Sequence, residues 1–258
     1  MESATYKCFE EKAIHDDRET ALGMSRREVL ALLAAAGGVM VAGRLSAQAG
    51  SASSTDGELP PCIVTPEQTE GPYFVDERLN RSDIRIDPAD GAVRAGMPLI
   101  LWLRVSSVKN AGCTPLAGAI VDIWHCDAAG VYSDVTDPSF NTVGKMFLRG
   151  YQVTDVNGAV RFTTIYPGWY RGRTVHIHFK VRVKVDSGQT YEFTSQLYFD
   201  DAITDRVHAH KTYASKGQRT VKNDGDGIFR DGGSQLMLSP VEQGEGYAAT
   251  FDVGLQVT

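Results

Sequence analysis

Short runs of alternating apolar and polar residues recur from residue 98 to the end of the chain. Residues 118–124 and 159–165 alternate most clearly, with β-branched or aromatic side chains on one face. Because successive side chains of a strand point to opposite faces, such runs predict half-buried strands. The same signal is present at residues 98–108, 147–154, 174–183, 191–199 and 247–255.

Glycine, asparagine and aspartate separate these predicted strands. Residues 155–158 (DVNG) predict a tight hairpin turn, because Asn-Gly readily adopts positive φ angles. Residues 200–215 predict the one helical or irregular segment, and residues 223–227 (NDGDG) a solvated turn rather than a calcium loop. The pattern predicts an all-β fold, an antiparallel β-sandwich of roughly 7–9 strands with long loops and an extended arm at residues 62–74.

The first fifty residues have a different character. Arg26 and Arg27 precede a small apolar run at residues 31–42, and residues 46–50 (SAQAG) resemble a cleavage site. This pattern predicts a twin-arginine signal and an exported protein, periplasmic or extracellular, with no membrane contact after cleavage. A disordered tail followed by a buried helix is the alternative. The predicted division is signal at residues 1–49, linker at 50–61 and domain at 62–258.

Composition narrows the class of protein. The 258 residues are 42% hydrophobic and 22% charged, with a net charge of -6 and no basic stripe, so no nucleic-acid partner is expected. Cys62, Cys113 and Cys126 follow the signal. Cys113 and Cys126 flank one predicted strand and should lie too far apart to join, so Cys62 is the expected partner of any bridge, although the pairing stays open.

The candidate chemistry is concentrated in residues 166–179 (YPGWYRGRTVHIHF). His176 and His178 share one face of a predicted strand and can bind one metal ion. The alternative is a pair of hydrogen-bonded histidines in a half-buried strand. A second His-x-His, His208 and His210, falls in the helical segment, where residues two apart diverge by about 200°, so both are predicted to be surface residues.

Two tyrosines accompany this strand. Tyr170 lies six residues before His176, and Tyr132 follows a predicted strand in a small-residue loop. Neutral imidazole and phenolate together suit ferric iron, because a hard trivalent ion stabilises an anion that is otherwise protonated at neutral pH. Structural packing is the alternative role for each tyrosine.

In its order of motifs, the chain resembles the intradiol ring-cleavage dioxygenases, a family of non-haem ferric enzymes with a β-sandwich fold. The resemblance covers most of residues 62–200. The matching segments are residues 69–73 (TEGPY), 115–119 (PLAGA), Trp124 with Tyr132, 167–170 (PGWY), 173–179 (RTVHIHF) and 195–199 (SQLYF).

The resemblance implies that Tyr132, Tyr170, His176 and His178 bind Fe(III), with Tyr170 and His178 axial. It further implies cleavage of a catechol-type ring by O2 between the two hydroxylated carbons, giving a muconate-type diacid. The implied catalytic residues beside the substrate are Arg173, Gln196 and Tyr170. The implied substrate pocket includes Thr69, Gly71, Pro72 and Trp169.

Two other functions compete with this one. A copper or zinc protein would use His125 with His176 and His178. An exported, non-catalytic β-sandwich binding module would use the fold alone, since fold does not imply function. The identity of the catechol, the side to which Arg171 points, and assembly into a homo-oligomer are left open by the sequence.

Overall fold

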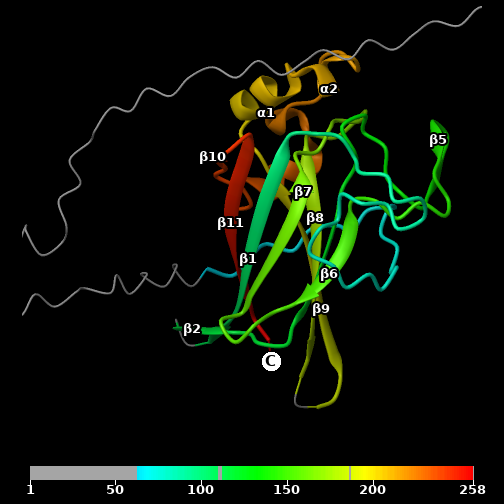
Figure 1. Cartoon of the computed structure of the whole chain (residues 1–258). Helices are drawn as coiled ribbons and strands as arrows, with labels where there is room; N and C mark the ends of the chain where they lie inside the picture. The colour runs from blue at the N-terminus through cyan, green and yellow to red at the C-terminus, as the bar shows by residue number, and fades with distance from the viewer. Residues whose placement is uncertain (1–62, 110–111, 186, 258) are drawn as a thin grey trace, which may run out of the picture. The chain divides into compact units, whose positions relative to one another are not determined.

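The computed structural model describes residues 63–109, 112–185 and 187–257. The predicted signal and linker lie outside these residues. Within them, the chain forms two main β-sheets with a helical segment at one end (Figure 1). No helix in this part of the chain has the length and apolarity needed to span a bilayer.

The larger sheet has five strands. Its order is β10-β11-β1-β2, and β7 also pairs with β1. β1 and β11 run parallel, which departs from the predicted all-antiparallel arrangement, whereas the other pairs are antiparallel. The strands are β1 (Pro98–Lys109), β2 (Gly112–Pro115), β7 (Ala159–Ile165), β10 (Val241–Gln243) and β11 (Gly246–Leu255).

The second sheet has four antiparallel strands in the order β6-β3-β8-β9. The hydrophobic core lies between the sheets and is filled by side chains such as Leu99 and Leu101 of β1 and Ile177 and Phe179 of β8, all fully buried. Each such side chain stabilises the fold by about 1.5–3 kcal/mol. The strands are β3 (Ile120–Trp124), β6 (Arg149–Val153), β8 (His176–Lys184) and β9 (Thr190–Tyr198).

All seven predicted strands are present, and so is the predicted tight turn, but its flanking strands do not pair as a hairpin. Residues 155–158 do form a tight turn, with Gly158 at φ +72°. The turn connects β6 to β7, which lie in different sheets, so it links the two layers instead of pairing its flanking strands. The pattern missed the short strands β2, β10, β4 (Thr136–Asp137) and β5 (Phe140–Asn141), which are too short for alternation to show.

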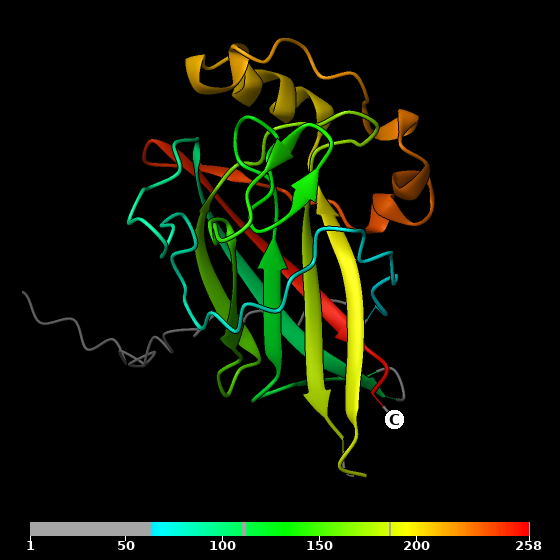
Figure 2. The same cartoon turned by 90° about the vertical axis from the view of Figure 1, so that its right-hand side faces the viewer.

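The predicted N-terminal arm crosses the outer face of the four-stranded sheet (Figure 2). Lys180 of β8 forms an ion pair with Glu70 of the arm, and its ammonium group lies 4.3 Å from the centre of the Phe74 ring. Arg182 of β8 pairs with Asp76 at 3.2 Å. The arm therefore covers a sheet face that would otherwise meet solvent.

The predicted helical segment contains two helices, and one histidine prediction is wrong. His210 is exposed as predicted, but His208 is half-buried. The His208 Nε2–H donates to the Pro167 carbonyl at 3.0 Å, and the ring stacks on Tyr213. The two helices of the segment are α1 (Asp201–His208) and α2 (Lys211–Ala214). The short helices η1 (Asn223–Gly225), α3 (Gly227–Arg230) and η2 (Gly233–Gln235) follow it.

The segment predicted as a solvated turn, residues 223–227, is instead partly buried. Asn223 is 7% exposed and Asp226 is 1% exposed. The Asn223 amide donates to the Phe199 carbonyl at 2.9 Å and accepts from the Thr174 hydroxyl at 2.7 Å. These hydrogen bonds join the turn to Thr174, just before β8, and to Phe199, just after β9, which a pattern of polar residues alone does not reveal.

The cysteines agree with the sequence reasoning as far as they are described. Cys113 is disulfide-bonded, and Cys126 is a buried free thiol. The two are therefore not bridged to each other. Cys62 lies outside the described residues.

Candidate metal centre

Strand register places three side chains of the candidate site in a row. His178 of β8 lies opposite Trp124 of β3 on one side and Gln196 of β9 on the other. The Trp124 and His178 rings stack with their centres 4.9 Å apart and an interplanar angle of 8°. His176 follows two residues earlier, and its Nε2 lies 3.0 Å from His178 Nε2, which confirms that both imidazoles share one face.

The two tyrosines arrive from loops that pack backbone against backbone. Tyr132 comes from the loop after β3, and Tyr170 from the loop between β7 and β8. A Cβ atom added at Gly168 would lie 2.4 Å from a carbonyl oxygen of the first loop, and one added at Gly130 would lie 2.1 Å from the Trp169 carbonyl. Glycine is required at both positions for the tyrosines to meet.

Four donor atoms converge at this point. His176 Nε2 lies 3.0 Å from His178 Nε2, 3.2 Å from Tyr170 Oη and 3.5 Å from Tyr132 Oη. Two ligands bound about 2.0–2.1 Å from one ion are about 3 Å apart at right angles and about 3.6 Å apart at 120°. The three separations fall in this range, so the four side chains could hold a single ion.

Both histidines are neutral, as a metal ligand must be, and a hydrogen bond orients the ring of His176. His176 Nδ1–H donates to the Thr174 carbonyl at 2.6 Å, which leaves the Nε2 lone pair facing the other donors. His178 Nδ1 is buried with no hydrogen-bond partner among the described residues. Burial lowers the pKa of His176 to about 3 and that of His178 well below its usual value, so both rings are neutral at pH 7.

The phenols need a cation to ionise. Burial raises the pKa of Tyr132 and of Tyr170 above the usual value of 10, so both are protonated in the protein alone. A hard, highly charged metal ion would reverse this, because it binds phenolate directly. Among the described residues, no group of three or more His, Cys, Asp and Glu side chains is arranged to hold a metal, so the donor set depends on the tyrosines.

His125 does not belong to this donor cluster. Its Nδ1–H donates to the Cys126 carbonyl at 2.8 Å, and its Nε2 lies 2.7 Å from the Thr164 hydroxyl. Both ring nitrogens are thus occupied by the protein. The copper or zinc site built on His125, which the sequence left as an alternative, has no support in this geometry.

Arg173 and Gln196 form a hydrogen-bonded network beside the cluster. Arg173 Nη2 donates to Gln196 Oε1 at 2.6 Å, and Gln196 Nε2 donates to the Thr69 carbonyl at 2.8 Å. Arg173 Nε donates at 2.8 Å to Asp226, which also accepts from the Thr174 amide. Sequence reasoning missed Asp226, because an Asp-Gly pair is also the usual signal of an exposed turn.

Tyr73 is a second residue of the site that the sequence reasoning did not select. Its ring stacks on Tyr132, with centres 4.4 Å apart, and meets Tyr170 edge-on at 6.2 Å. Its hydroxyl donates to Asp137 at 2.8 Å. The sequence did contain a signal for Tyr73, because this residue ends the motif at residues 69–73.

A pocket of about 620 Å³ opens beside the two tyrosines, within the size range of small-molecule sites. Trp169 lines it as predicted. Thr69, Gly71 and Pro72 are not among its lining residues; Gly71 lies behind the cluster, where an added Cβ would be 3.4 Å from His178 Cε1. The wall also includes Tyr73, Tyr132, Asp137, Phe140, Tyr170, Arg171, Lys216 and Thr220.

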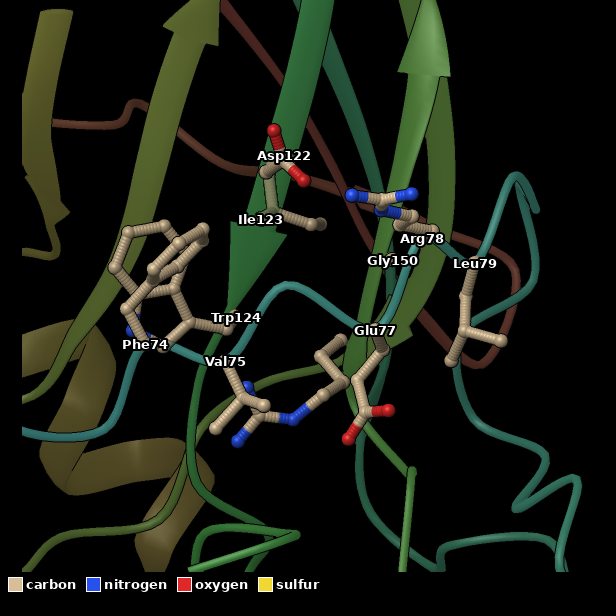
Figure 3. Close-up of a pocket in the computed structure, with 10 residues that line it drawn as sticks. Phe74, Val75, Glu77, Arg78, Leu79, Asp122, Ile123, Trp124 and Gly150 are labelled. Atoms are coloured by element: carbon tan, nitrogen blue, oxygen red, sulfur yellow. The ribbon is translucent and has the colours of Figure 1, made fainter.

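A second, much smaller cavity lies between the arm and the four-stranded sheet (Figure 3). The rings of Phe74 and Trp124 lie close together at its edge, with centres 4.8 Å apart, and Glu77 is among the residues that line it. Its volume of about 10 Å³ suits one water molecule, whereas even benzene requires about 150 Å³. It is a packing gap of the arm, so the larger pocket is the only one of the two that could take an aromatic ring.

Comparison with known proteins adds an independent observation. The sequence model of a protein family described as "Dioxygenase" matches residues 69–223 of this chain. A solved intradiol ring-cleavage dioxygenase from Tetranychus urticae is 30% identical and superposes with a TM-score of 0.64, covering 75% of this chain and 94% of that one. The dioxygenase domain of a dioxygenase and carbohydrate-binding fusion from Streptomyces sp. SirexAA-E is 28% identical, with a TM-score of 0.52, covering 76% of this chain and all of that one.

Curated relatives match over shorter stretches. The protocatechuate 3,4-dioxygenase beta chain of Burkholderia cepacia is 34% identical over 104 residues, which are 37% of this chain and 44% of the relative. The chain spans less than half the length of the first curated relatives it matches, between 36% and 49%.

Proposed function

This chain belongs to the intradiol ring-cleavage dioxygenase family, and from that premise we propose that it is an Fe(III)-dependent enzyme that uses O2 to cleave a catechol-type ring. Cleavage falls between the two hydroxylated carbons, each of which takes up one oxygen atom of O2, giving a muconate-type diacid. The observation that carries the proposal is the convergence of two neutral imidazoles and two buried phenols beside a pocket of ring size or larger.

In this proposal Tyr132, Tyr170, His176 and His178 hold the iron. Bound Fe(III) would act as a Lewis acid and template for the diol. Tyr170 lines the pocket, and its oxygen, once ionised to phenolate, would accept the proton of one substrate hydroxyl, while water takes up the proton of the other. The two catechol protons must leave the ring oxygens before these oxygens can bind a metal as anions.

The neighbouring residues orient and shield the reacting groups. Arg173 presents a cation whose direction is set by Asp226 and Gln196, so it can stabilise negative charge on the substrate without reorganising. Trp124 fixes the ring plane of His178 by stacking. Tyr73 covers the Tyr132 ring and excludes water from it.

Metal content, absorbance and oxygen uptake test the proposal together. Phenolate-to-Fe(III) charge transfer should give the purified protein a red-brown colour, and a catechol added under nitrogen should shift the band. Tyr132→Phe should lose the iron or the activity, whereas Tyr151→Phe, a half-buried tyrosine of β6 outside the donor cluster, should keep both. Stoichiometric iron without colour would refute phenolate ligation. Absence of oxygen uptake with every catechol tried would favour the non-catalytic binding module.

We also propose that the protein acts outside the cytoplasm, on the strength of the paired Arg26 and Arg27 before an apolar segment. Residues 1–50 fused to a folded reporter should direct it out of the cytoplasm. Replacement of both arginines by lysine should abolish that export. A reporter that stays in the cytoplasm with the native segment would contradict the assignment.

A further inference from the structure

Two cationic side chains of the pocket wall have no part in the site described so far. Arg171 follows the Tyr170 ligand candidate, and Lys216 comes from the segment after α2. Neither forms an ion pair with a carboxylate among the described residues. Arg171 is exposed, and Lys216 donates to the Ala129 carbonyl with its ammonium group 4.9 Å from the centre of the Trp169 ring.

The pocket offers these cations little internal compensation. Asp137 is the one acidic residue among those that line it. Its carboxylate already accepts from the Tyr73 hydroxyl at 2.8 Å and from the Ser139 amide at 2.8 Å. The wall therefore carries two positive charges against one engaged negative charge. Asp127, which does not line the pocket, offsets part of the Lys216 charge but not that of Arg171, so a net attraction for an anion remains.

The pocket also has more room than one ring needs. An apolar cavity of about 150 Å³ accepts benzene, whereas this pocket measures about 620 Å³. Its walls include the aromatic side chains of Phe140 and Trp169, and Lys216 lies over the latter. A catechol bound at Tyr132 and Tyr170 would leave space for a side chain that reaches the cations.

We infer that Arg171 and Lys216 are specificity-determining residues that select catechols whose ring carries an anionic side chain. The inference rests on the proposed function of the same site. Arg171 supplies a planar pair of donors suited to a carboxylate, and Lys216, oriented by the Ala129 carbonyl and the Trp169 face, supplies a second charge. Because the pocket is open, this attraction should weaken as salt is added.

The test compares two substrates with the same ring and side-chain length, one carrying a carboxylate and the other its uncharged methyl ester. The full-length, iron-loaded protein is assayed for oxygen uptake with 3,4-dihydroxycinnamate and with its methyl ester, and with unsubstituted catechol as reference. Arg171→Gln with Lys216→Met is the test variant. Lys211→Gln, an exposed lysine of α2 that does not line the pocket, is the matched control.

We expect wild type to prefer the acid to the ester by about tenfold in kcat/KM, and the double variant to lose that preference, mainly through KM. Iron content and absorbance of the variant should match wild type, which separates specificity from misfolding. The Lys211→Gln control should keep the preference. Equal use of acid and ester by wild type, or a preference that survives in the double variant, would overturn the inference alone. No uptake with any of the three catechols would overturn the proposed function, and this inference with it.

Discussion

The two sheets share one core but differ in their outer faces. On β1 of the five-stranded sheet, buried side chains alternate with exposed ones, and Trp102 is 40% exposed. On β8 of the four-stranded sheet both faces are buried from His176 to Val181, and His178 is 2% exposed. Most polar groups of a strand buried on both faces need partners within the protein. Here the arm and the two tyrosine loops pack around β8, the partly buried turn at residues 223–227 holds the residues just before it, and together they form the site.

Two aspartate–arginine pairs show the same difference at the scale of single contacts. Arg173 and Asp226 expose 16% and 1% of their side chains, whereas Arg104 and Asp252, on the five-stranded sheet, expose 48% and 34%. Both pairs join a carboxylate to a guanidinium, but they differ in how much of each side chain is exposed to water. Depth in the fold should therefore decide what each pair contributes to stability.

Replacing the aspartate of each pair with alanine should give the largest difference in the free energy of unfolding. Asp226→Ala leaves the Arg173 charge buried and unpaired, so we expect a loss of about 3–5 kcal/mol in the free energy of unfolding. Asp252→Ala should cost less than about 1 kcal/mol, because water solvates both partners. Urea denaturation of the two variants measures both values. Similar losses would show that burial does not separate the pairs.

The pH dependence of stability should sharpen the contrast. Burial alone would raise the pKa of Asp226, but the hydrogen bond from the Thr174 amide and the Arg173 guanidinium outweigh it and hold that pKa below the usual 3.8. Because the folded-state pKa is depressed, the stabilisation is present above about pH 4 and is lost as pH falls through the lower folded value.

The measurement is the unfolding free energy of wild type and Asp226→Asn from pH 6 to pH 2.5. We expect the advantage of wild type to shrink as the pH falls below about 4. The variant has no carboxyl group to titrate at this position and serves as the control. A difference between the two proteins that is constant with pH would contradict the pKa direction.

The smallest expected effect concerns the arm. Lys180→Met keeps the apolar stem but removes the ion pair with Glu70 and the charge over the Phe74 ring. We expect a loss of about 1 kcal/mol in local stability, seen as faster amide hydrogen exchange in residues 68–76. Arg104→Met on β1 is the matched control and should leave exchange in the arm unchanged. Unaltered exchange in Lys180→Met would mean that other contacts hold the arm.

Much of the fold was predictable from alternation alone. The seven longer strands were located because each buries one face and is long enough to show a period of two. Sheet membership was not predictable, and the turn at residues 155–158 shows why. Its Asn-Gly chemistry sets a tight reversal of the chain, but whether the flanking strands pair depends on which surfaces each strand must bury.

The candidate site also has some features that the sequence determined and others that only the tertiary structure decided. By itself the sequence determined the donor types and the shared face of His176 and His178, because side chains two apart on a strand must point the same way. Only the tertiary structure decided that Tyr132 reaches them, and that Tyr73 and Asp226 serve the same site. These contacts join segments far apart in the chain, and their geometry follows from sheet register and loop packing. No local pattern encodes that geometry.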